Sequence, residues 1–276
     1  MSASQTVRVD PFAEHARGPV RLMAHLVAGY PDMESSLVAA DGLAAGGVSF
    51  FEIQFPFSDP SADGPAIQTA CSESLRKGFT VSDGFALTAK LSERYPDIPV
   101  YIMSYANLVF HAGIETFVQR ARAAGVSGLI VPDLPFDSDE GLDAACRSAG
   151  LLFVPVAAPS MSDERIALLG GRRFPLVYAA LRAGITGQQT VIDGSTLAFL
   201  SRLNEASGGA SRILGGFGIR TGEQSRSLAP AVHAVIVGSR FVEEISAVCS
   251  SSGAHSAALS GNLRDALHRK AAEFTA

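Results

Sequence analysis

Eight short runs of apolar residues recur along this chain, and longer amphipathic segments separate most of them. Strands that alternate with helices, without a long linker, predict right-handed βαβ units and a parallel sheet. Eight such units fit an α/β fold of the closed (β/α)₈ or TIM-barrel type. A Rossmann fold would carry a dinucleotide fingerprint after its first strand, and the sequence there, V-A-G-Y-P, is not one. The predicted strands cover residues 22–27, 48–53, 100–104, 128–131, 152–156, 176–179, 212–214 and 234–237.

Helical patterns fill the intervals between these strands. We expect one barrel domain over residues 1–276, with an N-terminal extension or helix at 1–18 and an outer C-terminal helix at 254–276. The other predicted helices cover residues 34–45, 114–124, 140–148, 163–169, 194–204 and 222–228.

The composition narrows the class of protein. Of the 276 residues 47% are hydrophobic, which is enough for one sizeable core. The net charge of −5, without a run of Lys or Arg, argues against nucleic acid as a partner. Three widely spaced cysteines suggest reduced thiols, and the first residues lack a signal peptide or a membrane span. We therefore expect a cytoplasmic protein without a membrane partner.

Polar residues gather where the predicted strands end, which is where the active sites of TIM barrels lie. Glu52 is a single acid in an apolar run, and a buried carboxyl is costly unless something pairs with it or uses it. It fits a general acid/base beside an apolar wall, and equally a carboxylate paired with an arginine across the barrel. Asp63 precedes Gly64-Pro65, where its simplest role is to cap the next helix. Asp59 is most simply a turn residue.

Glycines occur in three consecutive strand-end loops, at 183–187, 216–218 and 237–239. Glycine lets backbone N–H groups approach an anion closely, and the last loop opens a helix whose dipole adds to the attraction. The loops after the seventh and eighth strands are the recurring phosphate position of TIM barrels. We therefore expect a phosphate monoester in the substrate.

The lysines and histidines exclude two kinds of aldolase. All three lysines fall in predicted helices or at their ends, so none offers the desolvated amine of a Schiff-base enzyme. The histidines are scattered: His111 has no neighbouring ligands, and His25 suits a core or pocket wall better than a metal site. We expect no metal and a reaction driven by acid–base catalysis.

Five motifs follow one another along the chain: P-F-S-D-P-S-A-D-G-P-A-I-Q, M-S-Y-A-N-L-V-F, I-V-P-D-L-P, A-G-I-T-G and G-G-F-G-I. Together they closely resemble the α subunits of tryptophan synthase, over residues 22–248. The resemblance implies a TIM barrel that cleaves indole-3-glycerol phosphate to indole and glyceraldehyde 3-phosphate, with no cofactor of its own. It also implies a β subunit that carries pyridoxal phosphate and receives the indole, in an α2β2 heterotetramer.

The resemblance implies catalytic roles for three residues. Glu52 matches the general acid/base that protonates the indole ring at C3 and accepts the hydroxyl proton as the bond breaks. Asp63 matches the acid that accepts a hydrogen bond from the indole N–H, and Tyr178 matches a tyrosine close to the catalytic acid. Because the ring protonated at C3 is itself the electron sink, this retro-aldol reaction requires neither lysine nor metal.

Binding roles are also implied by the resemblance. The implied phosphate cradle consists of Gly187, Gly216, Gly218, Gly238 and Ser239. The implied walls of the indole pocket are Ile67, Met103, Tyr105 and Phe217. The implied lid loop contains Arg182, Gly184 and Thr186, and the implied contacts with the β subunit are Pro56, Asp59 and Asp133.

Three positions depart from the family's pattern. Gln54 replaces a usual glycine, His25 stands where an apolar or aromatic residue is common, and Ala183 stands where many relatives have serine. Gln54 shares a strand face with Glu52, so we expect its amide either to hydrogen-bond to that acid or to narrow the pocket. The favoured function is the lyase. The alternatives are a catalytically weak subunit that mainly activates the β subunit, and an isomerase acting on another phosphate.

Overall fold

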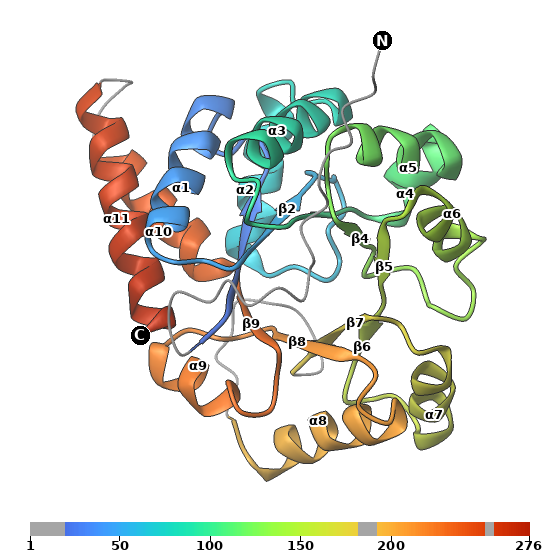
Figure 1. Cartoon of the computed structure of the whole chain (residues 1–276). Coiled ribbons are helices and arrows are strands. Elements are labelled where there is room, and N and C mark those ends of the chain that lie inside the picture. The colour runs from blue at the N-terminus through green and yellow to red at the C-terminus, as the bar shows by residue number, and fades with distance from the viewer. Residues whose placement is uncertain (1–19, 182–191, 252–256) are drawn as a thin grey trace.

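The sheet of this protein closes into a barrel that helices surround (Figure 1). The computed structural model describes residues 20–181, 192–251 and 257–276. In these residues nine parallel strands form one sheet, in the order β5-β4-β3-β2-β1-β9-β8-β7-β6. The strands are β1 (Leu22–Val27), β2 (Phe50–Gln54), β3 (Val100–Met103), β4 (Gly128–Ile130), β5 (Leu152–Val154), β6 (Val156–Ala157), β7 (Leu176–Ala180), β8 (Arg212–Gly216) and β9 (Ala234–Val237).

The two ends of this order are pieces of one strand, which is why the sheet closes. Only Pro155 separates β5 from β6, and its ring removes the N–H that a strand ladder would use. The carbonyl of Pro155 still accepts a hydrogen bond of 2.9 Å from the N–H of Tyr178 on β7. The predicted eight-stranded barrel is thus confirmed, with its fifth strand divided at this proline.

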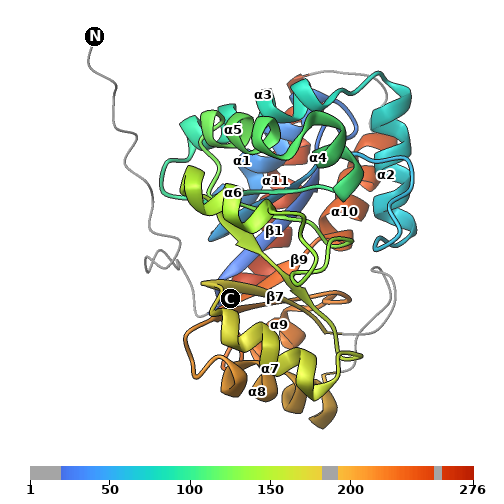
Figure 2. The same ribbon diagram turned by 90° about the vertical axis from the view of Figure 1, so that its right-hand side faces the viewer.

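Eleven helices in the described residues cover the outside of the barrel (Figures 1 and 2). Five of them begin at a side chain that accepts a hydrogen bond from the first turn: Asp32, Thr80, Ser162, Asp193 and Thr221. The helices are α1 (Met33–Ala45), α2 (Pro65–Arg76), α3 (Val81–Arg94), α4 (Ala106–Ala112), α5 (Ile114–Ala123), α6 (Leu142–Ala149), α7 (Asp163–Arg172), α8 (Gly194–Ala206), α9 (Gly222–Leu228), α10 (Ser239–Ser251) and α11 (Ala257–Thr275).

Two layers of apolar side chains stabilise the barrel. The larger layer fills the space between the strands and the helices. The smaller layer lies inside the barrel, because alternate residues of each strand point inward. Such burial is the main favourable term in folding. The inner layer consists of Met23, Phe50, Tyr101, Met103, Tyr105, Ile130, Val154, Leu176, Tyr178, Leu214, Ala234 and Ile236.

The C-terminal helix α11 packs against α1 and α10 on the outside of the barrel (Figure 1). Its contact with α1 requires glycine, because a Cβ at Gly42 would lie 2.3 Å from the backbone oxygen of Arg264. None of the described helices is long and apolar enough to cross a membrane. The expected N-terminal extension at 1–18 lies outside the described residues.

Candidate active site

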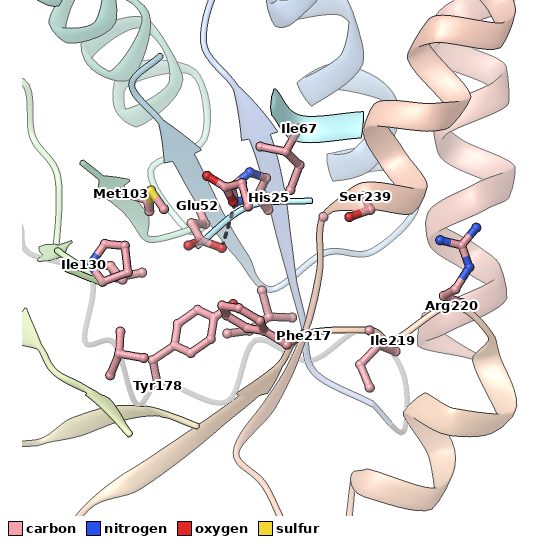
Figure 3. A pocket seen from close by; sticks show the side chains of 16 residues that line it. His25, Glu52, Ile67, Met103, Ile130, Tyr178, Phe217, Ile219, Arg220 and Ser239 are labelled. Atoms are coloured by element: carbon pink, nitrogen blue, oxygen red, sulfur yellow. Dashed lines mark ion pairs between the residues drawn. The ribbon is translucent and has the colours of Figure 1, made fainter. Parts of the chain in front are cut away.

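Strands β1 and β2 place three polar side chains inside the barrel. Parallel pairing sets His25 opposite Glu52 and Val27 opposite Gln54. Glu52 and Gln54 share the inward face because successive side chains alternate between the faces of a strand. His25, Glu52 and Gln54 are all buried. This arrangement brings an imidazole beside the predicted catalytic acid (Figure 3).

A cavity lies at the carboxyl ends of the strands (Figure 3). One side of the cavity carries the acids and apolar side chains, and the other is made by the loops after β8 and β9. The lining residues are His25, Glu52, Asp63, Ile67, Met103, Ile130, Pro132, Val156, Tyr178, Phe217, Gly218, Ile219, Arg220, Ile236, Gly238 and Ser239.

Glu52 is paired with a histidine. Its Oε2 lies 3.1 Å from Nδ1 of His25, and both side chains are almost fully buried. Burial lowers the pKa of His25, but the charge of Glu52 and hydrogen bonding to it outweigh burial and hold that pKa above its ordinary 6.5. The sequence left open an arginine as the partner of Glu52. Within the described residues, Glu52 forms its ion pair with His25 instead.

Asp63 is held by two side chains that donate to the same oxygen. Gln54 Nε2 donates to Oδ2 at 2.7 Å, and Tyr105 Oη donates to it at 2.8 Å. Burial raises the pKa of Asp63 above its ordinary value, although the charge of His25 and the two hydrogen bonds act against it. Helix α2 begins after Gly64 without a side-chain cap, so the expected capping role of Asp63 is wrong.

The position of Gln54 differs from what the sequence led us to expect. Its amide donates to Asp63, and at 3.5 Å to Sγ of Cys71, instead of to Glu52. Gln54 is not among the residues that line the cavity, so it supports Asp63 from behind and does not narrow the pocket. Burial raises the pKa of Cys71 to about 12, which keeps this neighbour a neutral thiol.

Tyr105 also lies behind Asp63 and is not part of the cavity lining. Its hydroxyl accepts a hydrogen bond of 3.0 Å from the N–H of Ala62 and donates to Asp63. Its ring stacks on Phe57, with the centroids 5.3 Å apart. Burial and the charge of Asp63 raise the pKa of Tyr105, so the phenol stays protonated and remains a donor. Tyr105 therefore fixes the loop that carries Asp63 against β3.

Tyr178 reaches the cavity from β7 (Figure 3). Burial, followed by the charges of Glu52 and Asp63, raises its pKa well above the ordinary value, so the side chain is a neutral phenol. Its ring meets the edge of Phe217 at a centroid distance of 5.8 Å. Gly216 makes room for it, because a Cβ there would lie 2.6 Å from the Tyr178 hydroxyl. The close approach of the Tyr178 hydroxyl therefore requires glycine at position 216.

The glycine-rich end of the cavity is formed by backbone. Phe217 and Gly218 after β8 both have a left-handed backbone, with φ of +77° and +82°. A bulky residue in this region is strained, and such strain is concentrated at functional sites. Gly238 and Ser239 follow β9, where α10 begins, and the first N–H groups of a helix are an anion site. Both loops line the cavity, so backbone N–H groups are available at this end for an anion.

Arg220 lines the glycine-rich end of the cavity, although the sequence analysis does not predict it as a site residue. Its guanidinium donates to both carboxylate oxygens of Glu243, at 3.0 and 2.9 Å, and Arg240 donates to Glu243 at 2.6 Å. Burial raises the pKa of Glu243, but the two arginines outweigh it and hold that pKa below its ordinary value. Its position directly after G-G-F-G-I is the sequence signal for Arg220.

The other predicted site residues lie apart from the cavity. Pro56 is buried, whereas Asp59 and Asp133 are exposed. The carboxylate of Asp133 accepts a hydrogen bond of 2.9 Å from the N–H of Ala106 at the start of α4. Four predicted residues are outside the described part of the chain: Arg182, Gly184, Thr186 and Gly187.

Fold and site together define a class of protein: a TIM barrel with two buried acids at one end of a cavity and glycine-rich backbone at the other. The sequence model described as "Tryptophan synthase alpha chain" matches residues 12–269. The tryptophan synthase alpha chain of Helicobacter hepaticus is 40% identical over 237 residues, which cover 84% of this chain and 88% of that protein. The chain belongs to the tryptophan synthase alpha chain family.

Solved structures agree with this assignment. The structure of Mycobacterium tuberculosis tryptophan synthase superimposes with a TM-score of 0.82 at 29% identity and covers 100% of both chains. The tryptophan synthase complex of Pyrococcus furiosus gives a TM-score of 0.77 at 27% identity, with 93% of this chain and 98% of that chain covered. The predicted fold and family are confirmed.

Proposed function

We propose that this chain is a lyase that cleaves indole-3-glycerol phosphate to indole and glyceraldehyde 3-phosphate by a retro-aldol reaction. The observation that carries the proposal is the convergence of Glu52 and Asp63 on one cavity whose far end is the backbone of Gly238 and Ser239. A substrate with an indole ring at one end and a phosphate at the other matches this division of the cavity.

The two acids take different parts in the proposed reaction. Glu52 protonates the indole ring at C3, which makes the ring an electron sink, and then accepts the proton of the glycerol hydroxyl as the carbon–carbon bond breaks. Asp63 accepts the indole N–H and stabilises the positive charge that develops there. Gln54 and Tyr105 both donate to Oδ2 of Asp63, so Oδ1 is the oxygen we assign to the substrate. Tyr178, a neutral phenol, serves as a donor beside Glu52.

The remaining walls of the cavity suit the two ends of this substrate. Ile67, Met103 and Phe217 provide apolar surface for the indole ring. Gly218, Gly238 and Ser239 offer backbone N–H groups to the phosphate, and Gly187 joins them in the proposal. The lid assigned to Arg182, Gly184 and Thr186, like Gly187, is proposed from the sequence alone.

We also propose a β subunit as the partner of this chain, because the similar structure from Pyrococcus furiosus is described as a tryptophan synthase complex. In this proposal the chain itself uses no metal or cofactor. It passes indole to a β subunit with pyridoxal phosphate, in a cytoplasmic α2β2 heterotetramer. Asp59 and Asp133 are exposed and available for the contact, whereas Pro56 is buried and shapes the loop beside it.

The test is release of indole from indole-3-glycerol phosphate by the purified chain, alone and with a matched β subunit. We expect slow release alone, strong activation by the β subunit, and no release by Glu52→Gln. No indole in either condition, together with faster β-subunit turnover of serine, would contradict the lyase and make this chain a regulatory subunit.

A further inference from the structure

Retro-aldol cleavage of this kind requires a carboxyl at Glu52, but it does not require a histidine beside it. In the acid end of the cavity wall, an ion pair joins His25 to Glu52, at 3.1 Å between Nδ1 and Oε2. The two residues are direct neighbours across β1 and β2 (Figure 3). His25 is therefore placed to act on the residue that the proposed reaction depends on.

The imidazole of His25 is confined on its other side by β9. A Cβ at Gly238 would lie 3.2 Å from Cβ, Cγ and Cδ2 of His25, so glycine at this position leaves room for the ring. Nε2 of His25 is buried and has no hydrogen-bond partner among the described residues. Burying a polar ring in this way is unfavourable unless a partner compensates. Oε2 of Glu52 is also buried without a hydrogen-bond partner among the described residues, so the 3.1 Å ion pair with Nδ1 is what compensates both groups.

The groups that face His25 favour its protonated form. Glu52 approaches from β2 and Asp63 from the loop before α2, and both carry negative charge when ionised. Gln54 on β2 adds a hydrogen-bonding group, and Tyr178 on β7 faces the same acids as a neutral phenol. The imidazole is thus surrounded by groups that stabilise a positive charge, although it is buried.

We propose that His25 is a positioning residue that shares one proton with Glu52, so that the pair holds the working proton of the lyase. The proposal rests on the proposed function. With the proton on Nδ1, Glu52 is ionised; with the proton on Oε2, the imidazole is neutral and Glu52 is ready to protonate indole C3. The hydroxyl proton that Glu52 then accepts restores the pair to its starting protonation, so protons balance over the cycle.

The pairing is tested by titrating the imidazoles of the full-length chain by NMR, in wild type and in Glu52→Gln. We expect His25 to bind its proton at least tenfold more weakly in Glu52→Gln, because the carboxylate is gone and burial remains. His111, which is exposed on α4, is the internal reference. An unchanged titration of His25 would overturn the proposal, even if neither protein releases indole.

The catalytic consequence is tested by the pH profile of indole release with His25→Phe. In this variant we expect kcat to fall on the alkaline side at a pH at least one unit lower than in wild type, which is a tenfold higher proton concentration. The reason is that Glu52 then has to retain the proton without His25. His233→Phe, at the opposite end of the barrel, is the matched control and keeps the wild-type profile. Thermal unfolding verifies that both variants fold.

If the alkaline limb of His25→Phe coincides with that of wild type, His25 only lines the pocket. That result would overturn its role as a positioning residue. Absence of indole release by wild type at every pH is a different result. It would overturn the proposed function, while the NMR titration still decides whether His25 and Glu52 share a proton.

Discussion

The two ends of the cavity are formed by different parts of the chain, side chains at one end and backbone at the other. The acid end consists of side chains from β1, β2, β3 and the loop before α2, and each acid has named partners: His25 for Glu52, Gln54 and Tyr105 for Asp63. The glycine-rich end consists of backbone after β8 and β9. The acid end can therefore be changed one group at a time, whereas the glycine-rich end depends on the path of the chain.

This difference separates chemistry from binding. Titratable groups at the acid end hold and move protons, and their pKa values depend on their neighbours. Backbone N–H groups at the glycine-rich end are fixed dipoles that do not titrate. Substitutions at the acid end should therefore lower kcat, and substitutions at the glycine-rich end should mainly raise KM.

After Glu52→Gln, the largest effect on this comparison is expected for Asp63→Asn. A neutral amide loses the charge that stabilises the protonated indole, and removing one such electrostatic group costs about 10²–10³ in kcat. Steady-state kinetics of indole release measure the change. A kcat within threefold of wild type would show that Asp63 has no electrostatic role in the reaction.

At the glycine-rich end we expect Gly218→Ala to raise KM about tenfold with kcat within threefold of wild type. Gly218 has a φ of +82°, where alanine is strained by roughly 1–2 kcal/mol, so the loop shifts away from the phosphate. Gly78→Ala is the matched control, since Gly78 has a φ of +90° and open space around it. A similar rise of KM in both variants would contradict a local effect on phosphate binding.

An effect of similar size is expected at the acid end for Tyr105→Phe, which removes one of the two donors to Asp63. A hydrogen bond to a charged group contributes about 1.5–3 kcal/mol, so we expect kcat/KM to fall about tenfold with a still functional Asp63. Tyr95→Phe is the matched control, because the hydroxyl of Tyr95 donates to Asp41 outside the cavity. Equal activity of the two variants would mean that Gln54 suffices to hold Asp63.

The same contrast explains what could be predicted from the sequence. Alternating strand and helix patterns predicted the barrel, and the strand-end position of Glu52 predicted its place in the cavity. The capping role expected for Asp63 was wrong because local sequence favours a cap, whereas the folded loop brings Gln54 and Tyr105 to its carboxylate. Such partners depend on strand register and loop path, which no local pattern contains.

Two further side chains depend on tertiary contacts in the same way. The sequence predicts His25 as a core or pocket-wall residue, and it does line the cavity, but only the register of β1 against β2 sets it opposite Glu52. Arg220 was not predicted because its place at the cavity depends on the strained turn at Phe217 and on the contact with Glu243. Both residues lie at positions where tertiary contacts decide the function of a side chain.

The smallest effect concerns the pH dependence of stability. The pKa of His25 is raised in the folded state, so its stabilisation is fully present below pH 6.5 and is lost as the pH rises through the raised value. Glu52→Gln removes this contribution. We expect the free energy of unfolding of wild type, minus that of Glu52→Gln, to decrease as the pH rises from 6.5 through the raised pKa of His25. Chemical denaturation at several pH values measures it, and a pH-independent difference would contradict the ion pair.

The most direct test of the central claim separates binding from turnover in Glu52→Gln. Calorimetry gives the Kd for indole-3-glycerol phosphate, and single-turnover experiments give the rate of indole formation. We predict a Kd within about threefold of wild type and a rate at least about 10³-fold lower, because Glu52 transfers protons and the glycine-rich end holds the phosphate. Retained turnover, or loss of binding with normal turnover of the bound fraction, would contradict the division of the cavity into a chemical end and a binding end.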